Sequence, residues 1–415
     1  MSTMLKSYTK RLLRFVTIGS VDDGKSTLIG RLLHDAKGLL KDQYEAVESL
    51  DNDREGVNFA FFTDGLKKER ELGITIDVAY RYFSTPKRKF IIADAPGHFE
   101  YTKNMVTACS RAQVAVLLID ARHGLLSQTK RHLFLASLLQ VKHVVICINK
   151  MDLVQFSEER FEAIKESVSQ YAAKLQIIDI QFIPTVATKG FNVVDTCEEM
   201  KWYKGGSLLF YLENVHVDSD ENRIDCRFPI QMVSKNESPF RYFGRVASGI
   251  FKKGDEVLLL PSKQKSKILK ITLGEKEIEE AIPGASILLT LDNNPLLHRG
   301  DMIVRPNNQP ETTNRFNCML FWLSDLGLDS NQPYYLLQAH RQEVCHIKTI
   351  LYKLDIETLH REFPPSKIGV NDIARIEIQT TSPLYIDSYQ KNRVTGSFIL
   401  VDKNSLATVA AGVII

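Results

Sequence analysis

In the first half of the chain, short apolar runs alternate with stretches in which apolar residues recur at helical spacing. The runs predicted as strands are Leu12–Ile18, Val78–Phe83, Phe90–Ala93, Val114–Ile119, His143–Ile148 and Ile180–Pro184. The stretches predicted as helices are Thr27–Leu33, Tyr101–Ser110, Ser127–Leu139 and Glu158–Leu175. This alternation is typical of an α/β domain with a mostly parallel sheet and helices on both faces.

The pattern changes after about residue 215, where Val217–Asn222 forms a polar linker. Short apolar runs then follow one another with glycines between them, which is typical of a β-barrel or a sandwich. The predicted strands are Arg227–Val233, Tyr242–Ala247, Glu256–Leu260, Ile268–Leu273, Ile287–Leu291 and Met302–Val304.

A second such region follows Pro306–Pro310, a stretch of proline and asparagine that predicts a boundary. Its predicted strands are Arg315–Leu323, Tyr334–Gln338, Glu343–Leu351, Ile373–Gln379 and Ser397–Val401. We therefore predict three domains, over residues 1–215, 216–306 and 307–415.

The stretch from Gly19 to Ser26 fits the pattern G-x-x-x-x-G-K-[ST] of a phosphate-binding loop. It lies between a predicted strand and a predicted helix, which is the context that the motif requires. Glycines let successive backbone N–H groups turn inward, and these donors form an anion site with the helix N-terminus. Lys25 is expected to reach the β- and γ-phosphates, and the Ser26 hydroxyl is expected to bind Mg²⁺.

Other chemistry-bearing strings follow predicted strands, where ligands of parallel sheets bind. Asp94 can hold a Mg²⁺-bound water, and Gly97 lets the backbone approach a γ-phosphate. In Asn149–Asp152, the Asp152 carboxylate can accept hydrogen bonds from N1–H and the 2-amino group of guanine, which adenine lacks. A backbone N–H in Val186–Lys189 can bond the guanine O6. Together these strings predict a GTPase domain.

A further element, Gly73–Asp77, lies before the second predicted strand. A threonine here, for which we choose Thr75, can bind Mg²⁺ through its hydroxyl and the γ-phosphate through its N–H. Loops of this kind become ordered with GTP and relax after hydrolysis.

Composition and charge are consistent with the predicted GTPase domain. The chain has 415 residues, 44% of them hydrophobic and 25% charged, and a net charge of +3, which is too small to indicate nucleic acid by itself. Its six cysteines are scattered and form no C-x-x-C pair. This pattern is typical of free thiols in a reducing cytoplasm, and it indicates neither a zinc site nor a disulfide framework. No apolar run approaches the length of about 18 residues that a membrane span needs.

These strings resemble the translational GTPases, typified by elongation factor Tu. Gly73–Ile76 and Pro96–His98 carry the resemblance most specifically. It implies that His98 orients the attacking water, that Val21 and Ile74 screen that water, and that Asp22 helps to hold a monovalent cation.

A narrower resemblance is to the large, GTPase-bearing subunit of bacterial ATP sulfurylase, sulfate adenylyltransferase subunit 1. The strings that carry it are Asp64–Leu66, Gly73–Phe83, Lys89–Asp94, Asp120–Arg122, Arg131–His132, Trp202–Tyr203 and Arg227–Pro229, so that it runs nearly end to end. Two departures are Val186, where a serine is usual, and Phe99–Tyr101. No second phosphate-loop motif follows residue 300, so the fused adenylylsulfate kinase of some family members is absent from this sequence.

This resemblance implies a P-loop GTPase domain followed by two all-β barrel domains. It also implies GTP and Mg²⁺ as cofactors, and a heterodimer with a small catalytic subunit that binds ATP and sulfate. The predicted catalytic residues are His98, Lys25 and Thr75, and the predicted metal ligands are Ser26, Thr75 and, through water, Asp94. The residues predicted to bind GTP are Gly19, Ser20, Val21, Asp22, Asp23, Gly24, Lys25, Ser26, Thr27, Asp94, Ala95, Pro96, Gly97, His98, Asn149, Lys150, Met151, Asp152 and Ala187, the last through its backbone.

Two other functions fit parts of the pattern. A translation factor that carries tRNA fits the GTPase domain and the first barrel nearly as well, and steeply salt-dependent tRNA binding would distinguish it. The second is a regulatory GTPase that only binds a partner.

Two further sequence features have ordinary structural interpretations. The basic run Lys263–Lys270 is interpreted as a solvated strand face. His340, Cys345 and His346 match no zinc-ligand spacing.

Overall fold

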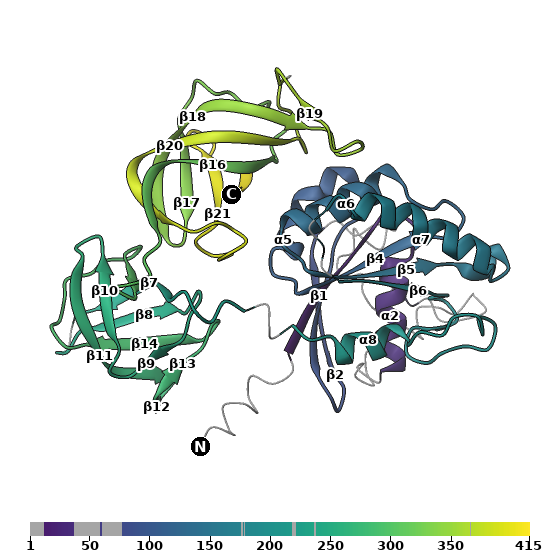
Figure 1. The fold of residues 1–415 in the computed structure, drawn as a ribbon, viewed down its shortest axis with the longest axis horizontal. Helices are drawn as coiled ribbons and strands as arrows, with labels where there is room; N and C mark the ends of the chain where they lie inside the picture. The colour runs from purple at the N-terminus through teal and green to yellow at the C-terminus, as the bar shows by residue number, and fades with distance from the viewer. Residues whose placement is uncertain are drawn as a thin grey trace. The chain divides into compact units, whose positions relative to one another are not determined.

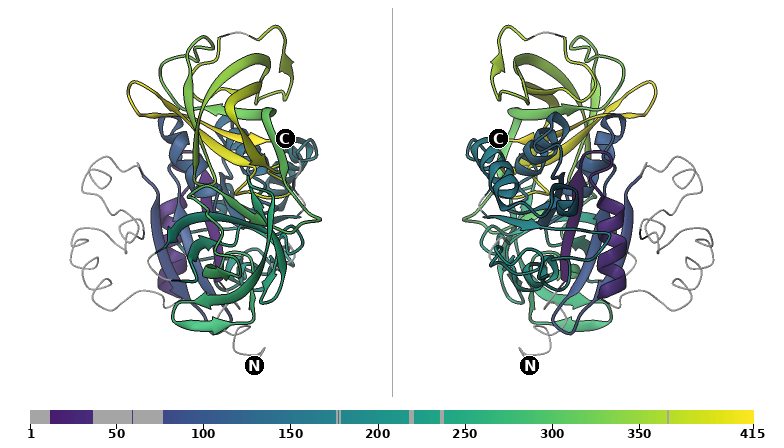
Figure 2. Two further views of the ribbon diagram at one scale, coloured as in Figure 1. Left: turned by 90° about the vertical axis from the view of Figure 1, so that its left-hand side faces the viewer. Right: turned by 90° about the vertical axis from the view of Figure 1, so that its right-hand side faces the viewer.

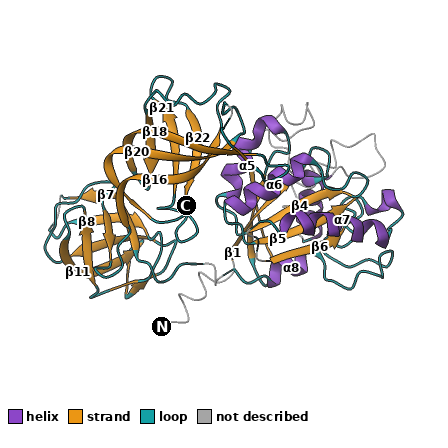
Figure 3. Cartoon of the chain, turned by 45° about the horizontal axis from the view of Figure 1, so that its top comes forward, coloured by secondary structure: helices purple, strands orange, loops and turns teal. Residues whose placement is uncertain are grey.

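The computed structural model describes residues 12–36, 59, 77–175, 177, 179–217, 221–235, 238–365 and 367–415. The chain divides into two units between His216 and Val217. Among the described residues, all helices belong to the first unit, and the second consists of strands and loops (Figure 3).

The first unit is built on one six-stranded sheet in the order β2-β3-β1-β4-β5-β6. The strands are β1 (Leu12–Gly19), β2 (Ala79–Ser84), β3 (Lys89–Asp94), β4 (Val114–Asp120), β5 (His143–Asn149) and β6 (Asp179–Pro184). All neighbours pair in parallel except β2, which is antiparallel to β3. Every residue of β4 is buried, as expected of a central strand that is covered on both faces.

Helices cover both faces of this sheet. They are α2 (Lys25–Asp35), α5 (Thr102–Cys109), α6 (Ser127–Leu138), α7 (Glu158–Ala172) and α8 (Leu208–Asn214), with the 3₁₀ turns η2 (Phe99–Tyr101) and η3 (Met151–Val154). In Figure 1, α5, α6 and α7 lie on one face and α2 and α8 on the other. Helix α2 lies against β1, both drawn in purple in Figure 2. The predicted α/β fold is therefore confirmed.

Helix α7 shows how the apolar spacing produces this packing. Its N-cap, Ser157, accepts a hydrogen bond from the Arg160 N–H, and two glutamates occupy the first turn. Phe161, Ile164 and Val168 follow at helical spacing and are buried. Burial of this stripe fixes the helix on the sheet while its charged face stays in water.

The parallel strands bring four predicted strand ends to one edge of the sheet. Gly19 ends β1, Asp94 ends β3, Asp120 ends β4 and Asn149 ends β5. Side chains that are far apart in the sequence are therefore collected where ligands of such sheets bind.

The second unit contains two closed antiparallel barrels, as predicted. The first is a ring of β7 (Arg227–Ser234), β8 (Arg241–Arg245), β14 (Ser286–Leu291), β11 (Gln264–Leu273), β10 (Glu256–Leu260) and β15 (Met302–Val304). The short strands β9 (Phe251–Lys252), β12 (Lys276–Ile278) and β13 (Glu280–Ala281) lie outside that ring. In β11 the lysines are exposed and Ser266, Ile268 and Ile271 are buried, so the basic run is a solvated strand face.

The second barrel is a ring of β16 (Glu311–Trp322), β20 (Ile373–Ile386), β18 (Arg341–Leu354), β17 (Tyr334–Gln338), β21 (Ser397–Asp402) and β22 (Thr408–Ile414), with β19 (Arg361–Glu362) beside β18. Its core contains Trp322, Tyr334 and Phe398. Cys345 points into this core while His346 is exposed, and the His340 ring bonds Gln231. The three residues do not converge, and no group of histidine, cysteine and acidic residues suited to a metal ion occurs in the described part of the chain.

Candidate functional site

The predicted phosphate loop links the end of β1 to the start of α2. Gly24, the N-cap of α2, has φ +95°, and a Cβ atom there would collide with the Asn149 amide, so only glycine fits. The Ser20 N–H donates to Asp23 Oδ2 at 2.6 Å, which closes the loop on itself. Gly24 supplies no side-chain cap, so the N-terminus of this 11-residue helix keeps N–H donors that a phosphate can take.

Lys25 is buried in this loop, and the residue is only 7% exposed. Its Nζ donates to the carbonyl oxygens of Gly19 at 3.1 Å and Ser20 at 2.6 Å. Burial lowers the pKa of Lys25, while the charge of Asp94, and less strongly that of Asp23, acts to raise it. The two acceptors of the Lys25 ammonium are carbonyl oxygens, which carry no formal charge. The negative charge of a nucleotide phosphate beside the ammonium would therefore stabilise the protonated form of this lysine.

Residues suited to Mg²⁺ lie next to this lysine. Ser26 Oγ lies 3.4 Å from Asp94 Oδ2, and the Thr17 hydroxyl donates to Asp94 Oδ1 at 3.0 Å. Asp94 is buried at the end of β3. Hydroxyl and carboxylate oxygens are the donors that Mg²⁺ prefers, so these residues fit the predicted ion. Thr75, the third predicted ligand, lies outside the described residues, as does Ile74.

Gly97 packs against the phosphate loop. A Cβ atom at this position would collide with Lys25 Nζ, with the Gly19 carbonyl oxygen and with the backbone of Ser20. The next residue, His98, has a side chain that is 43% exposed, and its Nδ1 accepts a hydrogen bond from the Glu100 N–H at 3.4 Å. The structure thus joins the turn after β3 to the loop and leaves the predicted water-orienting imidazole open to solvent.

Asn149 ties the predicted base-binding strings to the loop. Its Nδ2 donates to the Asp23 carbonyl at 2.8 Å, and its Oδ1 accepts from the Ala187 N–H at 3.0 Å and from Thr185 Oγ1 at 3.3 Å. The predicted guanine contact of the Ala187 N–H would therefore have to be shared with Asn149. Asp152 is partly exposed, with Lys189 Nζ 3.9 Å from its carboxylate.

The other predicted residues lie in the same region. Val21 and Asp22 are exposed at the tip of the loop, Thr27 lies in the first turn of α2, Ala95 and Pro96 are buried after β3, and Met151 is buried in η3. Burial raises the pKa of Asp23, and the nearby Lys25 charge opposes this.

Asp120 is a buried carboxylate next to Lys150 that the sequence analysis did not include among the predicted site residues. Its carboxylate is 2% exposed, lies 2.9 Å from Lys150 Nζ and accepts from Arg122 Nη2 at 2.7 Å. Burial alone would raise the pKa of Asp120, but hydrogen bonds from Arg122 and Lys150 bring it below its usual range. Its position at the end of β4, like that of Asp94 at the end of β3, was the signal that could have identified it.

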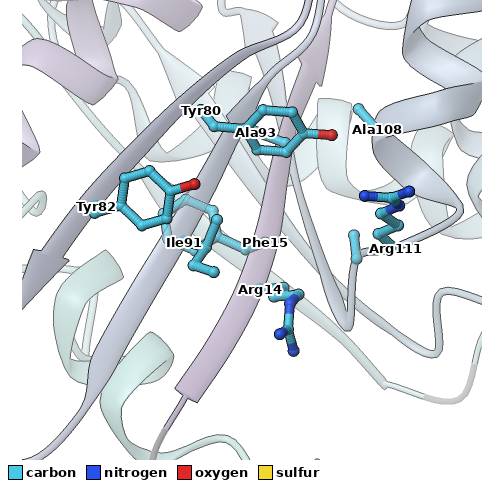
Figure 4. Close-up of a pocket in the computed structure, with 9 residues that line it drawn as sticks. Arg14, Phe15, Tyr80, Tyr82, Ile91, Ala93, Ala108 and Arg111 are labelled. Carbon is cyan, nitrogen blue, oxygen red and sulfur yellow. The ribbon is translucent and has the colours of Figure 1, made fainter. Parts of the chain in front are cut away.

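A separate hollow of about 270 Å³ lies on the first unit (Figure 4). Tyr80 and Tyr82 of β2 stand on one side of it, and Arg14 of β1 and Arg111 on the other. Arg14 lies near the start of β1, whereas the phosphate loop follows its end. This hollow shares no residue with the candidate nucleotide site described above.

Helices long and apolar enough to cross a bilayer are absent from the described residues.

The sequence matches the model of the elongation factor Tu GTP binding domain over residues 10–217. Elongation factor Tu domain 2 matches over residues 241–304, and the GTP-eEF1A C-terminal domain-like family over residues 315–415.

Three relatives are similar over almost the whole chain. Sulfate adenylyltransferase subunit 1 of Bacteroides fragilis is 48% identical over 99% of this chain and 87% of the relative. The protein of the same name from Bacteroides thetaiotaomicron is 47% identical over 99% of this chain and 87% of its own length. The bifunctional enzyme CysN/CysC of Rhodopirellula baltica is 46% identical over 98% of this chain and 64% of that protein. With a nucleotide-binding fold, a complete phosphate loop and identity of this extent, the chain belongs to the sulfate adenylyltransferase subunit 1 family.

Proposed function

We propose that this chain is the GTPase subunit of a heteromeric ATP sulfurylase. In this proposal a separate small subunit joins ATP and sulfate into adenylylsulfate and pyrophosphate, and GTP hydrolysis in this chain drives that reaction. The observation that carries the GTPase part is the convergence of Lys25, the Ser26–Asp94 pair and Gly97 at one edge of the sheet. The sulfate part rests on the names of the relatives.

The residues around the phosphates have separate tasks. Lys25 and the N–H groups at the start of α2 hold and neutralise the β- and γ-phosphates. Ser26, Asp94 through water, and Thr75 hold Mg²⁺, which supplies positive charge where negative charge develops. His98 orients the attacking water, for which its half-exposed ring is accessible.

The base is selected on the other side of the loop. Asp152 accepts hydrogen bonds from guanine, and a base without those donors would leave its carboxylate unpaired. Asn149 holds the loop of Asp23 and the backbone of Ala187 in one arrangement. Lys150 adds a second tie to the loop through the Asp22 carbonyl.

The partner in this proposal is the small catalytic subunit, with ATP and sulfate bound there and the two chains forming a hetero-oligomer in the cytoplasm. We propose neither a membrane nor a nucleic acid as a partner. The phosphosulfate anhydride is very unfavourable to form, so a reaction that only equilibrates ATP and sulfate yields little product. Coupling to the hydrolysis of GTP would pull it forward.

The test is sulfate-dependent release of pyrophosphate. The full chain is mixed with its candidate small subunit, ATP, sulfate and Mg²⁺, and GTP is compared with a non-hydrolysable analogue. We expect only GTP to drive release past the uncoupled equilibrium. Lys25→Ala should abolish that gain, whereas Lys165→Ala, which removes an exposed lysine paired with Glu162, should leave it unchanged.

Two results would contradict the proposal in different ways. Hydrolysis of GTP that is indifferent to ATP and sulfate would leave a GTPase with another substrate, and salt-dependent tRNA binding would then be measured. An analogue that works as well as GTP would show that binding, and not hydrolysis, supports the reaction.

A further inference from the structure

His132 is a buried polar side chain to which the proposed reaction assigns no task. It lies on α6, one helical turn after Gln128, and is 0% exposed. The Gly19 N–H at the start of the phosphate loop donates to its Nδ1 at 3.2 Å. The imidazole is therefore a direct partner of the loop, although 113 positions separate the two residues.

This contact fixes the tautomer of the imidazole. Burial, followed by the charges of Lys25 and Arg131, lowers the pKa of His132 to about 3, so the ring is neutral at neutral pH. A neutral imidazole has one N–H, and Nδ1 needs its lone pair to accept from Gly19. The proton must therefore lie on Nε2, which needs an acceptor of its own.

The group that faces Nε2 is the side-chain amide of Gln128. Its Nε2 atom lies 3.1 Å from the imidazole Nε2 and 3.4 Å from the carbonyl oxygen of Gly97. The imidazole N–H requires the amide oxygen in this place, whereas the Gly97 carbonyl requires the amide N–H. A half turn of the amide exchanges the two groups, so Gln128 satisfies one neighbour at the expense of the other.

The carbonyl group that can accept from Gln128 belongs to the peptide that joins Gly97 to His98. Gly97 also lies close to the Gly19 carbonyl and the Lys25 ammonium, which a Cβ atom at this position would meet. A donor from Gln128 thus determines how this peptide, and with it the start of the His98 side chain, is oriented over the phosphate loop.

We propose that Gln128 and His132 are positioning residues for His98, and that the Gln128 amide couples the Gly97–His98 peptide to the phosphate loop. The amide has two settings. In one it donates to Gly97 and orients the peptide for hydrolysis, and in the other it accepts from His132 and releases the peptide. This inference rests on the proposed GTPase function, because it assigns a task in that reaction.

The first test separates hydrolysis from binding. Gln128→Met keeps the length of the side chain and removes the hydrogen bonds to Gly97 and His132. Gln128→Glu carries only acceptor oxygens, so it can still accept from His132 Nε2–H but cannot donate to the Gly97 carbonyl. For the full chain we expect both variants to lower kcat for GTP about tenfold, as a misplaced catalytic group does, with KM changed less than about twofold. Gln170→Met, the same change on an exposed turn of α7, should match the wild type.

A wild-type kcat in Gln128→Met, or a rise in KM alone, would overturn the inference while the proposed function stands. The second test is independent of turnover: nitrogen-15 NMR of histidine-labelled protein should show His132 with its proton on Nε2 in the wild type and in Gln128→Glu. A proton on Nδ1 would overturn the inference. If the wild-type chain hydrolyses no GTP, the proposed function has failed, and the NMR result alone decides whether the His132–Gln128 pairing is correct.

Discussion

The ammonium of Lys150 lies 2.9 Å from the buried carboxylate of Asp120 and also donates to the Asp22 carbonyl in the phosphate loop. Lys150 has φ +61°, an uncommon backbone conformation for a residue with a side chain. Asp120 thus anchors both the side chain and the strained backbone of a residue that holds the loop in place.

Substitution of Asp120 is expected to loosen nucleotide binding. Asp120→Asn keeps the shape but removes the charge that holds Lys150, and hydrogen bonds to charged groups are worth about 1.5–3 kcal/mol. We expect GDP to dissociate at least about tenfold faster, as measured by stopped-flow fluorescence of a labelled nucleotide. Arg122→Ala should have a smaller effect, because Arg122 is half exposed. A wild-type dissociation rate in Asp120→Asn would contradict this prediction.

Asp152 is expected to determine the choice of base. Asp152→Asn replaces an acceptor by a donor, so it should weaken GTP binding by about a hundredfold or more and favour xanthosine triphosphate, which carries an acceptor at the 2-position. The measurement is a titration of the two nucleotides by calorimetry. Because Lys189 lies near Asp152, Lys189→Ala serves as a control for simple loss of local charge. Equal loss of both nucleotides in Asp152→Asn would count against a base contact.

A buried ion pair joins the two barrels of the second unit. Arg227 Nε and Nη2 donate to the Asp387 carboxylate at 2.8 and 2.9 Å, and both side chains are almost fully buried. Arg227 Nη1 also donates to the carbonyl oxygens of Cys226 and Asn308. These bonds compensate the burial of the guanidinium and the carboxylate.

Removal of the guanidinium should therefore leave the buried Asp387 carboxylate without its main partner, because among the described residues only the Thr395 hydroxyl at 2.7 Å and the Lys391 ammonium at 3.8 Å remain. Arg227→Met is expected to destabilise the second unit by about 3–5 kcal/mol. The matched change Arg315→Met, which breaks an exposed pair with Glu377, should cost less than about 1 kcal/mol. Urea unfolding of the full chain in a Trp202→Phe background, followed through Trp322, compares the two, and similar midpoints would refute the prediction.

His132 should make the stability of the first unit depend on pH. Its pKa of about 3 in the fold lies below the value of about 6.5 in an unfolded chain, so between these values the unfolded chain binds more protons. The stabilisation is complete above about pH 6.5 and is lost by about 1.4 kcal/mol per pH unit as the pH falls toward 3.

The check compares the wild type with His132→Gln, which cannot titrate. In a Trp322→Phe background, Trp202 reports the first unit, since the chain has two tryptophans. The difference in stability between wild type and variant should shrink between pH 6.5 and 4.5. A constant difference would mean that His132 is not held neutral by the fold.

Local pattern was sufficient for most elements. Strongly apolar runs such as Val114–Ile119 are buried as strands of the central sheet, and the observed strand Val114–Asp120 ends within a residue of the predicted bound. Strands β3 and β5 likewise lie within a residue or two of their predicted bounds. Strands β9, β12, β13 and β19 are only two or three residues long, too short to show a period, and they were missed. The final strand, Thr408–Ile414, was missed as well.

The sequence by itself determined the class of fold and the phosphate loop, because both are encoded within a few neighbouring positions. Only the tertiary structure showed that Asp120 holds Lys150, that His132 bonds Gly19 and that Gln128 faces Gly97. The physical reason is that these contacts join residues 30 to 113 positions apart. Which of these residues come into contact depends on the order of the strands in the sheet, and the spacing of residues along the chain does not carry that information.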